Sequence, residues 1–85
     1  MSYRVTLTAT AVKERKRIDP VARKRIDQAL IGLQSEPRPS GVKKLSGRHQ
    51  DWRVRVGDYR ILYEIDDDQQ QITIWRIAHR RDVYR

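Results

Sequence analysis

The sequence predicts a small α+β domain in which two helices pack on one face of an antiparallel sheet. Three observations support this prediction: the N-terminus alternates like a strand, two helical segments follow, and the second half alternates apolar and polar residues. Strands and helices that are segregated along a chain in this way are typical of α+β folds. With 85 residues the chain has room for one domain with one core, over residues 1–85.

Residues 3–8 alternate and are rich in β-forming side chains, so they predict a short first strand. Thr8 or Thr10 can then provide the N-cap of a helix that runs through residues 11–18. Together with the next helical segment, this helix predicts a helical hairpin between the first strand and the rest of the sheet.

The second helix is predicted from Pro20 to Ser35. Asp19 is a good N-cap, and proline is tolerated in the first turn of a helix. A Pro- and Gly-rich loop over residues 36–41 ends the helix. Its apolar side chains recur at helical spacing, which predicts packing onto the sheet. They are Ala22, Ile26, Ala29, Leu30 and Leu33.

The stretch from Trp52 to Ile65 predicts a β-hairpin. Two alternating segments flank Gly57-Asp58, and glycine at the first turn position suits a type II′ turn, which needs positive φ there. This turn also decides which side chains share a face of the hairpin. The predicted core face carries Trp52, Val54, Val56, Tyr59, Ile61, Tyr63 and Ile65, and the other face carries Arg53, Arg55, Arg60, Leu62 and Glu64.

The predicted register sets Arg55 directly opposite Arg60. Like charges in this position destabilise a sheet, so the pair requires an explanation. One explanation is an anionic ligand on this face of the hairpin. The other is a solvated outer face on which a nearby carboxylate, Glu64 or Asp58, neutralises the arginines. The pair alone does not decide between the two.

Residues 72–78 predict the last strand, after a polar loop over residues 66–71. The aspartates of that loop lack the spacing and the terminal glutamate of an EF-hand, so a solvated turn is predicted rather than a metal site. An antiparallel meander of three strands would bring the tail, residues 79–85, to the turn end of the hairpin. We therefore expect the tail to lie close to the arginines, with Lys43 and Lys44 flanking the same surface.

The formal net charge of +8 and a pI of about 10.4 favour a polyanionic partner such as nucleic acid, an acidic protein or a membrane surface. Arginine outnumbers lysine, and its planar guanidinium binds phosphate bidentately and stacks on bases, which favours nucleic acid. The lack of cysteine excludes disulfides and cysteine-ligated metals. Without a membrane-spanning run or a signal-peptide block, we expect a soluble cytoplasmic protein.

The arginines of the hairpin and the tail suit chemistry at a phosphodiester. Cleavage of RNA by its own 2′-OH requires a proton acceptor, a proton donor for the leaving 5′ oxygen, and stabilisation of charge at phosphorus. Arginines supply the last of these. His79 is the candidate for proton transfer because histidine ordinarily titrates near neutrality, and Tyr84 can stack on a base. An ordinary surface histidine and a C-terminal packing tyrosine are the alternatives for these two residues.

Three segments together resemble the RelE branch of the RelE/ParE toxin superfamily: Lys44–Gly47, Trp52–Ile65 and Ile77–Tyr84. The similarity covers essentially the whole chain, including the order of its elements. The resemblance implies an mRNA interferase, that is, the ribosome-dependent endonuclease toxin of a type II toxin–antitoxin pair. Such toxins cut mRNA in the ribosomal A site by 2′-OH attack and use no metal and no other cofactor.

Carried over by position, the resemblance implies that Arg60 stabilises the transition-state phosphate. It assigns Arg80 to the leaving group and Tyr84 to stacking on a base.

Two further arginines, Arg53 and Arg55, stand where the best-known RelE sequence has lysines. Because arginine effectively never loses its proton, we expect both to clamp phosphate rather than to act as a base. His79 replaces a lysine at the matching position, and we expect it to take over acid–base catalysis. Four further residues are expected to bind RNA phosphates: Lys43, Lys44, Arg48 and Arg81.

The resemblance also implies an acidic, RelB-like antitoxin that covers the basic surface in a hetero-oligomer. Further implied partners are mRNA and 16S rRNA in the ribosomal A site, and promoter DNA bound only through the antitoxin complex; no membrane is involved. Two alternatives stay open: a ParE-like inhibitor of DNA gyrase that cleaves no RNA, and a non-catalytic nucleic-acid-binding module. The set Arg60, Arg80, Tyr84 and His79 favours the RelE prediction, because ParE-type chains generally lack such a set.

Overall fold

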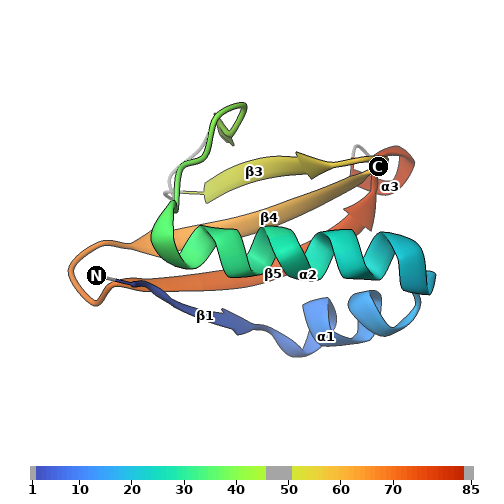
Figure 1. Cartoon of the computed structure of the whole chain (residues 1–85), viewed down its shortest axis with the longest axis horizontal. Helices are drawn as coiled ribbons and strands as arrows, with labels where there is room; N and C mark the ends of the chain where they lie inside the picture. The colour runs from blue at the N-terminus through green and yellow to red at the C-terminus, as the bar shows by residue number, and fades with distance from the viewer. Residues whose placement is uncertain (1, 46–50, 84–85) are drawn as a thin grey trace.

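A five-stranded sheet with two helices on one side forms the molecule (Figure 1). This computed structural model describes residues 2–45 and 51–83. The elements are β1 (Arg4–Leu7), α1 (Ala9–Lys16), α2 (Pro20–Ser35), β2 (Lys43–Lys44), β3 (Asp51–Val56), β4 (Tyr59–Asp66), β5 (Gln71–His79) and α3 (Arg80–Val83). Within these described residues no helix is both long and apolar enough to cross a membrane.

The strand order β1-β5-β4-β3-β2 contains the predicted antiparallel meander of β3, β4 and β5. The first strand lies parallel to β5 at one edge, where residues 4–7 pair with residues 71–74. Two short elements were not predicted: β2, which pairs with β3 at the other edge, and α3, which follows β5 directly. The predicted α+β class, with helices on one face of the sheet, is confirmed.

The hairpin of β3 and β4 has the predicted register. Val56 pairs with Tyr59, and Arg55 pairs with Arg60. Gly57 has a φ of 59°, whereas Asp58 is not among the described residues with positive φ. This combination is that of the predicted type II′ turn, which leaves the two strands with the twist that an antiparallel pair prefers.

Both long helices begin at side-chain caps. Thr8 Oγ1 accepts a hydrogen bond from the Ala11 N–H at 3.2 Å, and Asp19 Oδ1 accepts one from the Ala22 N–H at 3.1 Å. The second helix has the predicted bounds, while α1 begins at Ala9, two residues before the expected start. Each cap satisfies one N–H that the first helical turn would leave without a partner.

The core lies between α2, α1 and one face of the sheet. The apolar stripe predicted for the second helix packs there, and α2 crosses in front of β4 and β5 in Figure 1. The core face predicted for the hairpin meets this stripe. The buried core side chains are Ala11, Ile18, Ile26, Leu30, Leu33, Ile61, Tyr63, Ile65, Ile72, Ile74 and Ile77.

Beyond the end of β1, the helix α1 takes over the exposed edge of β5. Glu14 Oε1 accepts a hydrogen bond from the Ile77 N–H at 2.8 Å, and Glu14 Oε2 binds Arg76 Nε at 2.9 Å. The Glu14 carboxylate thus takes the place of the backbone carbonyl that a neighbouring strand would offer to the Ile77 N–H. The register shifts between Leu62 and Tyr63, which leaves Trp75 unpaired and sets Arg76 opposite Leu62. This bulge determines which side chains of β5 face the core, a question that the sequence left open.

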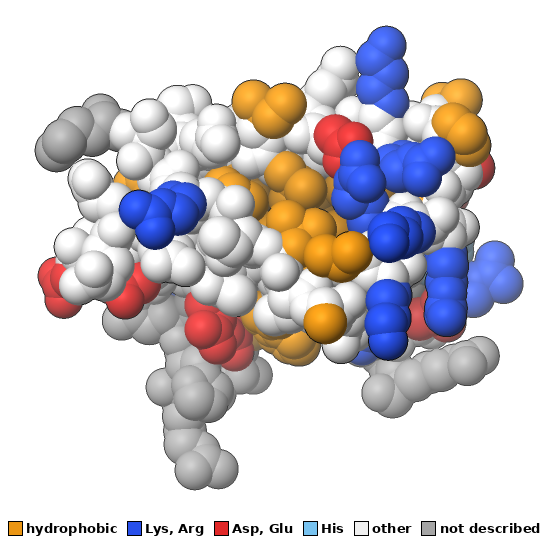
Figure 2. Space-filling model, turned by 90° about the horizontal axis from the view of Figure 1, so that it is seen from below, with side chains coloured by type: hydrophobic (Ala, Val, Ile, Leu, Met, Phe, Trp, Pro, Cys, Tyr) orange, Lys and Arg blue, Asp and Glu red, His pale blue; other side chains and the backbone are white. Residues whose placement is uncertain are grey.

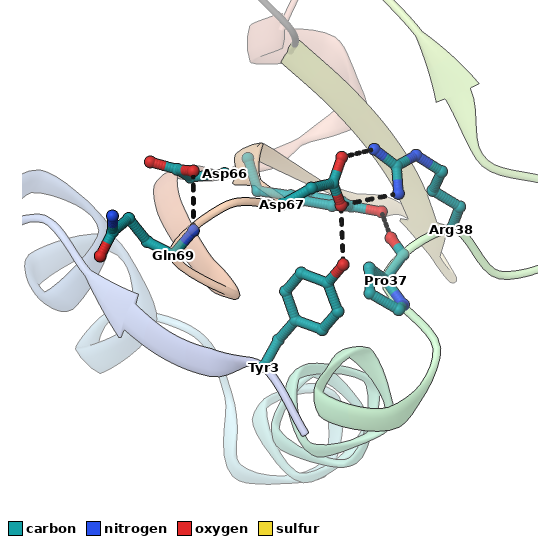
Figure 3. Close-up of polar contacts among 7 residues, drawn as sticks. Tyr3, Pro37, Arg38, Asp66, Asp67 and Gln69 are labelled. Carbon is teal, nitrogen blue, oxygen red and sulfur yellow. Dashed lines mark hydrogen bonds and ion pairs between the residues drawn. The ribbon is translucent and has the colours of Figure 1, made fainter. Parts of the chain in front are cut away.

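A polar network holds the loop between α2 and β2 against the turn between β4 and β5 (Figure 3). Asp67 accepts hydrogen bonds from Tyr3 Oη at 2.7 Å and from both terminal nitrogens of Arg38, at 3.3 and 2.9 Å. The Arg38 guanidinium also lies 5.0 Å from the ring centroid of Trp52 in β3. The loop that leads to Lys43 is therefore fixed at two points.

Tyr63 adds a buried bond to the same loop, since its Oη donates to the Pro37 carbonyl at 2.8 Å. Burial raises the pKa of Tyr63 to about 12, so the hydroxyl keeps its proton at neutral pH. In the neighbouring turn, Asp66 Oδ1 accepts a bond from the Gln69 N–H at 3.1 Å (Figure 3). Among the described residues, no cluster of His, Asp or Glu side chains could hold a metal ion.

Replacing Asp67 by asparagine is expected to lower the melting temperature at pH 7. Hydrogen bonds from Arg38 and then Tyr3 hold the pKa of Asp67 below its usual range. A carboxylate with a depressed pKa stabilises the fold above its unfolded pKa of about 3.9 and loses this effect as the pH falls further. The difference in melting temperature between wild type and variant should therefore disappear as the pH drops below about 4.

Thermal melts at pH 7 and at lower pH would test this, with Asp68→Asn as a matched removal of an exposed charge from the same turn. A constant difference between wild type and Asp67→Asn across the acid range would contradict the account. Asp27, whose pKa is also lowered by its hydrogen bonds from Arg15, contributes acid sensitivity to all three proteins equally.

Candidate functional site

Basic side chains gather on the face of the sheet that points away from the helices. The pairing of the strands places these positions in two rows across the sheet. Side chains directly opposite each other on neighbouring strands point to the same face. The first row consists of Lys43, Arg53, Leu62 and Arg76, and the second of Arg55, Arg60 and Ala78. We call the group Lys43, Arg53, Arg55 and Arg60 the arginine face.

Three members of the arginine face line one hollow. Lys43, Arg53 and Arg55, together with Gly41, surround a space of about 250 Å³ at the β2 edge of the sheet. Lys43 and Arg55 are exposed, and Arg53 is half-buried. Cationic side chains that converge on one hollow favour an anion, and guanidinium groups match the geometry of phosphate oxygens.

Arg60 is the buried member of the arginine face. Only 4% of its surface is exposed. Its Nη1 donates to the Tyr59 carbonyl at 3.2 Å, and its buried Nε has no hydrogen-bond partner within residues 2–45 and 51–83. None of the described carboxylates forms an ion pair with it. A buried charge without a counter-ion destabilises a fold, so the lack of a described carboxylate partner makes Arg60 a candidate for binding an anion.

The centre of this face is not the solvated surface that was one of the two explanations considered from the sequence. Leu62 and Ala78 are each only 5% exposed, and both lie next to Arg60. The reason is that the meander places β4 in the middle of the sheet, with strands on both sides. The surface therefore has an exposed rim at β2 and β3 and a buried arginine behind it.

Two predicted site residues lie on the opposite face. His79 pairs with Tyr59, whose partner Val56 packs on the core, so its ring lies on the helix side. Lys44 pairs with Trp52, and its Nζ lies 5.9 Å from the Trp52 ring centroid, also on the helix side. The expectation that both flank the arginine face is wrong, because side chains alternate between the two faces of a strand.

The two arginines of the tail lie in α3, beside the turn of the hairpin. The Arg80 N–H donates to the Asp58 carbonyl at 2.7 Å, and Arg80 Nε lies 4.0 Å from Asp58 Oδ1. Arg81 follows and is exposed. The predicted arrival of the tail at the turn end is thus confirmed. Two predicted residues, Arg48 and Tyr84, lie outside the described residues.

The sequence analysis did not include Arg76 in the site, although it lies on the same side of the sheet as the arginine face, in the first of the two rows. Its ion pair with Glu14 of α1 neutralises it, at 2.9 Å between Nε and Oε2. The available signal was the break in alternation at Trp75-Arg76, which marks a bulge in the strand. The pairing across that bulge required the structure.

A second basic region lies on α1 and α2. Figure 2 shows Lys and Arg side chains gathered at one end of the face seen from below, next to an apolar area. This face is not the arginine face, so the positive charge of the chain is spread over two surfaces. The exposed basic residues of the two helices are Lys13, Lys16, Lys24 and Arg25.

The chain is similar to known toxins over nearly its whole length. Toxin RelG of Mycobacterium tuberculosis is 34% identical, over 100% of this chain and 99% of its own length. Toxin RelE3 of Methanocaldococcus jannaschii is 33% identical, over 95% and 94%. A chain in the crystal structure of the archaeal RelE–RelB complex from Pyrococcus horikoshii has a TM-score of 0.86 at 29% identity, covering 96% of this chain and 99% of its own.

The fold and these relatives define a toxin of the RelE type. A family model described as the ParE toxin of the type II toxin–antitoxin system, parDE, matches residues 5–84. The chain therefore belongs to this toxin family, and the resemblance to the RelE/ParE superfamily is confirmed. The isolated RelE toxin of Escherichia coli, with a TM-score of 0.81 at 21% identity, shows the same fold.

Proposed function

We propose that this toxin is a ribosome-dependent endoribonuclease that cuts mRNA in the A site. The observation that carries the proposal is the buried Arg60 guanidinium, whose Nε has no partner in the described part of the chain and which lies directly opposite the cationic Arg55. A pre-positioned cation in a site of low exposure is suited to the charge that develops on a phosphate. The relatives named as RelE and RelG toxins support the same class.

In the proposed reaction, the 2′-OH of the RNA attacks the neighbouring phosphorus. A bond forms between the 2′ oxygen and phosphorus while the bond from phosphorus to the 5′ oxygen breaks, which leaves a 2′,3′-cyclic phosphate and a 5′-OH. The 2′ proton is lost and the 5′ oxygen gains one. Arg60 stabilises the extra negative charge on the phosphate oxygens, and Arg80 stabilises the charge that develops on the leaving 5′ oxygen.

The exposed rim of the arginine face would hold the neighbouring phosphates. Lys43, Arg53 and Arg55 serve there as phosphate clamps. The guanidinium groups of the two arginines keep their protons and do not act as bases. Arg48 and Arg81 extend the contact with RNA by charge. Tyr84 remains the predicted stacking residue for a base. A group other than these arginines must accept the 2′ proton and donate the proton to the 5′ oxygen.

The proposed partner is an acidic antitoxin. Solved complexes of relatives pair RelE with RelB, and a net charge of +8 favours an acidic segment. An apolar hollow of about 360 Å³ between β1 and α2, with Ile31 65% exposed, would take its apolar side chains. In the resulting hetero-oligomer, promoter DNA would be bound through the antitoxin. On the cytoplasmic ribosome, the toxin would contact mRNA and 16S rRNA.

The cleavage proposal is tested by mapping mRNA 5′ ends in a translating extract to which the toxin is added. The expected result is a set of cuts in phase with the A site, with 5′-OH ends. The same mRNA without ribosomes should stay intact under the same conditions. Uncut mRNA on ribosomes that are fully occupied by toxin would overturn the proposal.

The second candidate is a ParE-like inhibitor of DNA gyrase, favoured by the name of the family model that matches the chain. It predicts intact mRNA and arrested replication in the same assays. A third outcome, salt-sensitive RNA binding without turnover, would indicate a non-catalytic binding module. These three outcomes exclude one another.

A further inference from the structure

His79 stands at the junction between β5 and α3. It is the last residue of the strand, and Arg80 begins the helix. Its ring packs edge-on against Tyr59, with 5.5 Å between the ring centroids and an angle of 77° between the planes. This contact holds the imidazole on the helix side of the sheet, where it lines a hollow with Asp19, Arg25 and Asp58.

The Nδ1 atom of His79 accepts two hydrogen bonds from Arg81. The backbone N–H of Arg81 lies 3.3 Å from Nδ1, and the side-chain Nε lies 3.4 Å from it. A side chain that accepts from the second N–H of the helix that follows it acts as an N-cap.

The first N–H of α3 is held as well. The Arg80 N–H donates to the Asp58 carbonyl in the turn of the hairpin at 2.7 Å. The start of α3 is thus tied to the hairpin at Asp58 and to the end of β5 at His79. A four-residue helix has little stability of its own, so these ties decide where Arg80 and Arg81 point.

His79 also faces away from the proposed phosphate site. Ala78, the residue before it, pairs with Arg60 on the arginine face, so alternation turns His79 to the other side of the sheet. A proton acceptor or donor must reach the reacting oxygen within hydrogen-bond distance or through one water. The geometry of the strand does not offer His79 this reach.

We propose that His79 is a positioning residue, which caps α3 through Nδ1 and thereby sets Arg80 and Arg81 beside the hairpin turn. This inference rests on the proposed function where it concerns RNA cleavage. It replaces the expectation that His79 transfers a proton. The capping itself is a property of the fold and is measurable without RNA.

The first test is limited trypsin digestion of the intact protein, followed by the loss of the C-terminal residues in mass spectra. Cutting after Arg80 or Arg81 requires α3 to open. His79→Ala should speed this release on the order of tenfold, as loss of an N-cap implies. His79→Asn retains a cap and should match wild type, whereas His79→Gln has the same amide on a longer chain and should behave as alanine. Equal release from wild type and His79→Ala would overturn the capping.

The second test is single-turnover mRNA cleavage on ribosomes with the same variants. Positioning predicts that His79→Asn cleaves within a few-fold of wild type, while the alanine and glutamine variants lose on the order of tenfold. If His79→Asn protects α3 from trypsin but cleaves mRNA as slowly as His79→Ala, the inference is overturned in favour of proton transfer. If wild type itself does not cleave, the proposed function fails, and the trypsin result alone decides the role of His79.

Discussion

Replacing Arg60 by alanine is expected to slow mRNA cleavage on the ribosome by on the order of 10²-fold or more. Arg60 is 4% exposed, and its guanidinium is already positioned before RNA binds, so it stabilises charge in the transition state without reorganisation. Arg60→Lys retains the charge but loses the planar fork, and should recover only part of the rate. Single-turnover cleavage with saturating toxin measures this effect apart from binding.

The matched control is Arg4→Ala, which removes an exposed arginine from β1 at the far edge of the sheet. Its cleavage rate should stay close to that of wild type. Stability gives an independent readout: Arg60→Met removes a buried charge that has no ion pair, so its melting temperature should rise while its activity falls. An Arg60→Ala protein that folds and cleaves at the wild-type rate would remove Arg60 from the site.

Replacing Ile26 by alanine is expected to lower the free energy of unfolding by about 2–5 kcal/mol, the usual range for a buried isoleucine. Ile26 is fully buried between α2 and the sheet. The loss combines the transfer of the missing methyl groups with the cavity that they leave. For a domain of this size, such a loss is a large part of the total stability.

Ile31→Ala is the matched control on the same helix, since Ile31 is 65% exposed. Its free energy of unfolding should change by no more than about 0.5 kcal/mol. Urea unfolding of the three proteins, followed by circular dichroism, measures both differences. Equal losses for the two variants would contradict the packing of the amphipathic stripe onto the sheet.

The hairpin register was predictable because two local signals agree. The alternation on both sides of Gly57-Asp58 and the preference of glycine for positive φ select one pairing, and the structure has it. The cap Asp19 was predictable because it lies directly before a helical pattern. For the first helix the sequence left Thr8 and Thr10 as alternatives, and the structure has Thr8. In these places the local preferences match the final fold.

The side of the sheet taken by His79 required the structure. The expected strand ended at Ala78, which left His79 in a tail without a defined face. The strand continues to His79, and alternation from Ile77, which faces the core, places the two on the same side. Lys44 was misplaced because β2 was not expected at all.

The central place of β4 follows from the predicted meander, but the burial of Arg60 was not predicted. Alternation along a strand shows which face a side chain takes. It does not show how far the neighbouring side chains on that face cover it. The charge pattern was sufficient to find the arginines, but the tertiary pairing decides which of them is buried.

The central claim is that RNA binds on the arginine face. The location of RNA on the toxin tests this claim most directly. An mRNA with a photoreactive 4-thiouridine in the A-site codon and a 2′-deoxy nucleotide at the cut position would stay intact on the ribosome with toxin bound. After irradiation, mass spectrometry identifies the crosslinked peptides. The account predicts crosslinks to β2, β3, the start of β4 and the tail, over residues 43–44, 51–60 and 80–84. Crosslinks confined to α1 and α2 would contradict it.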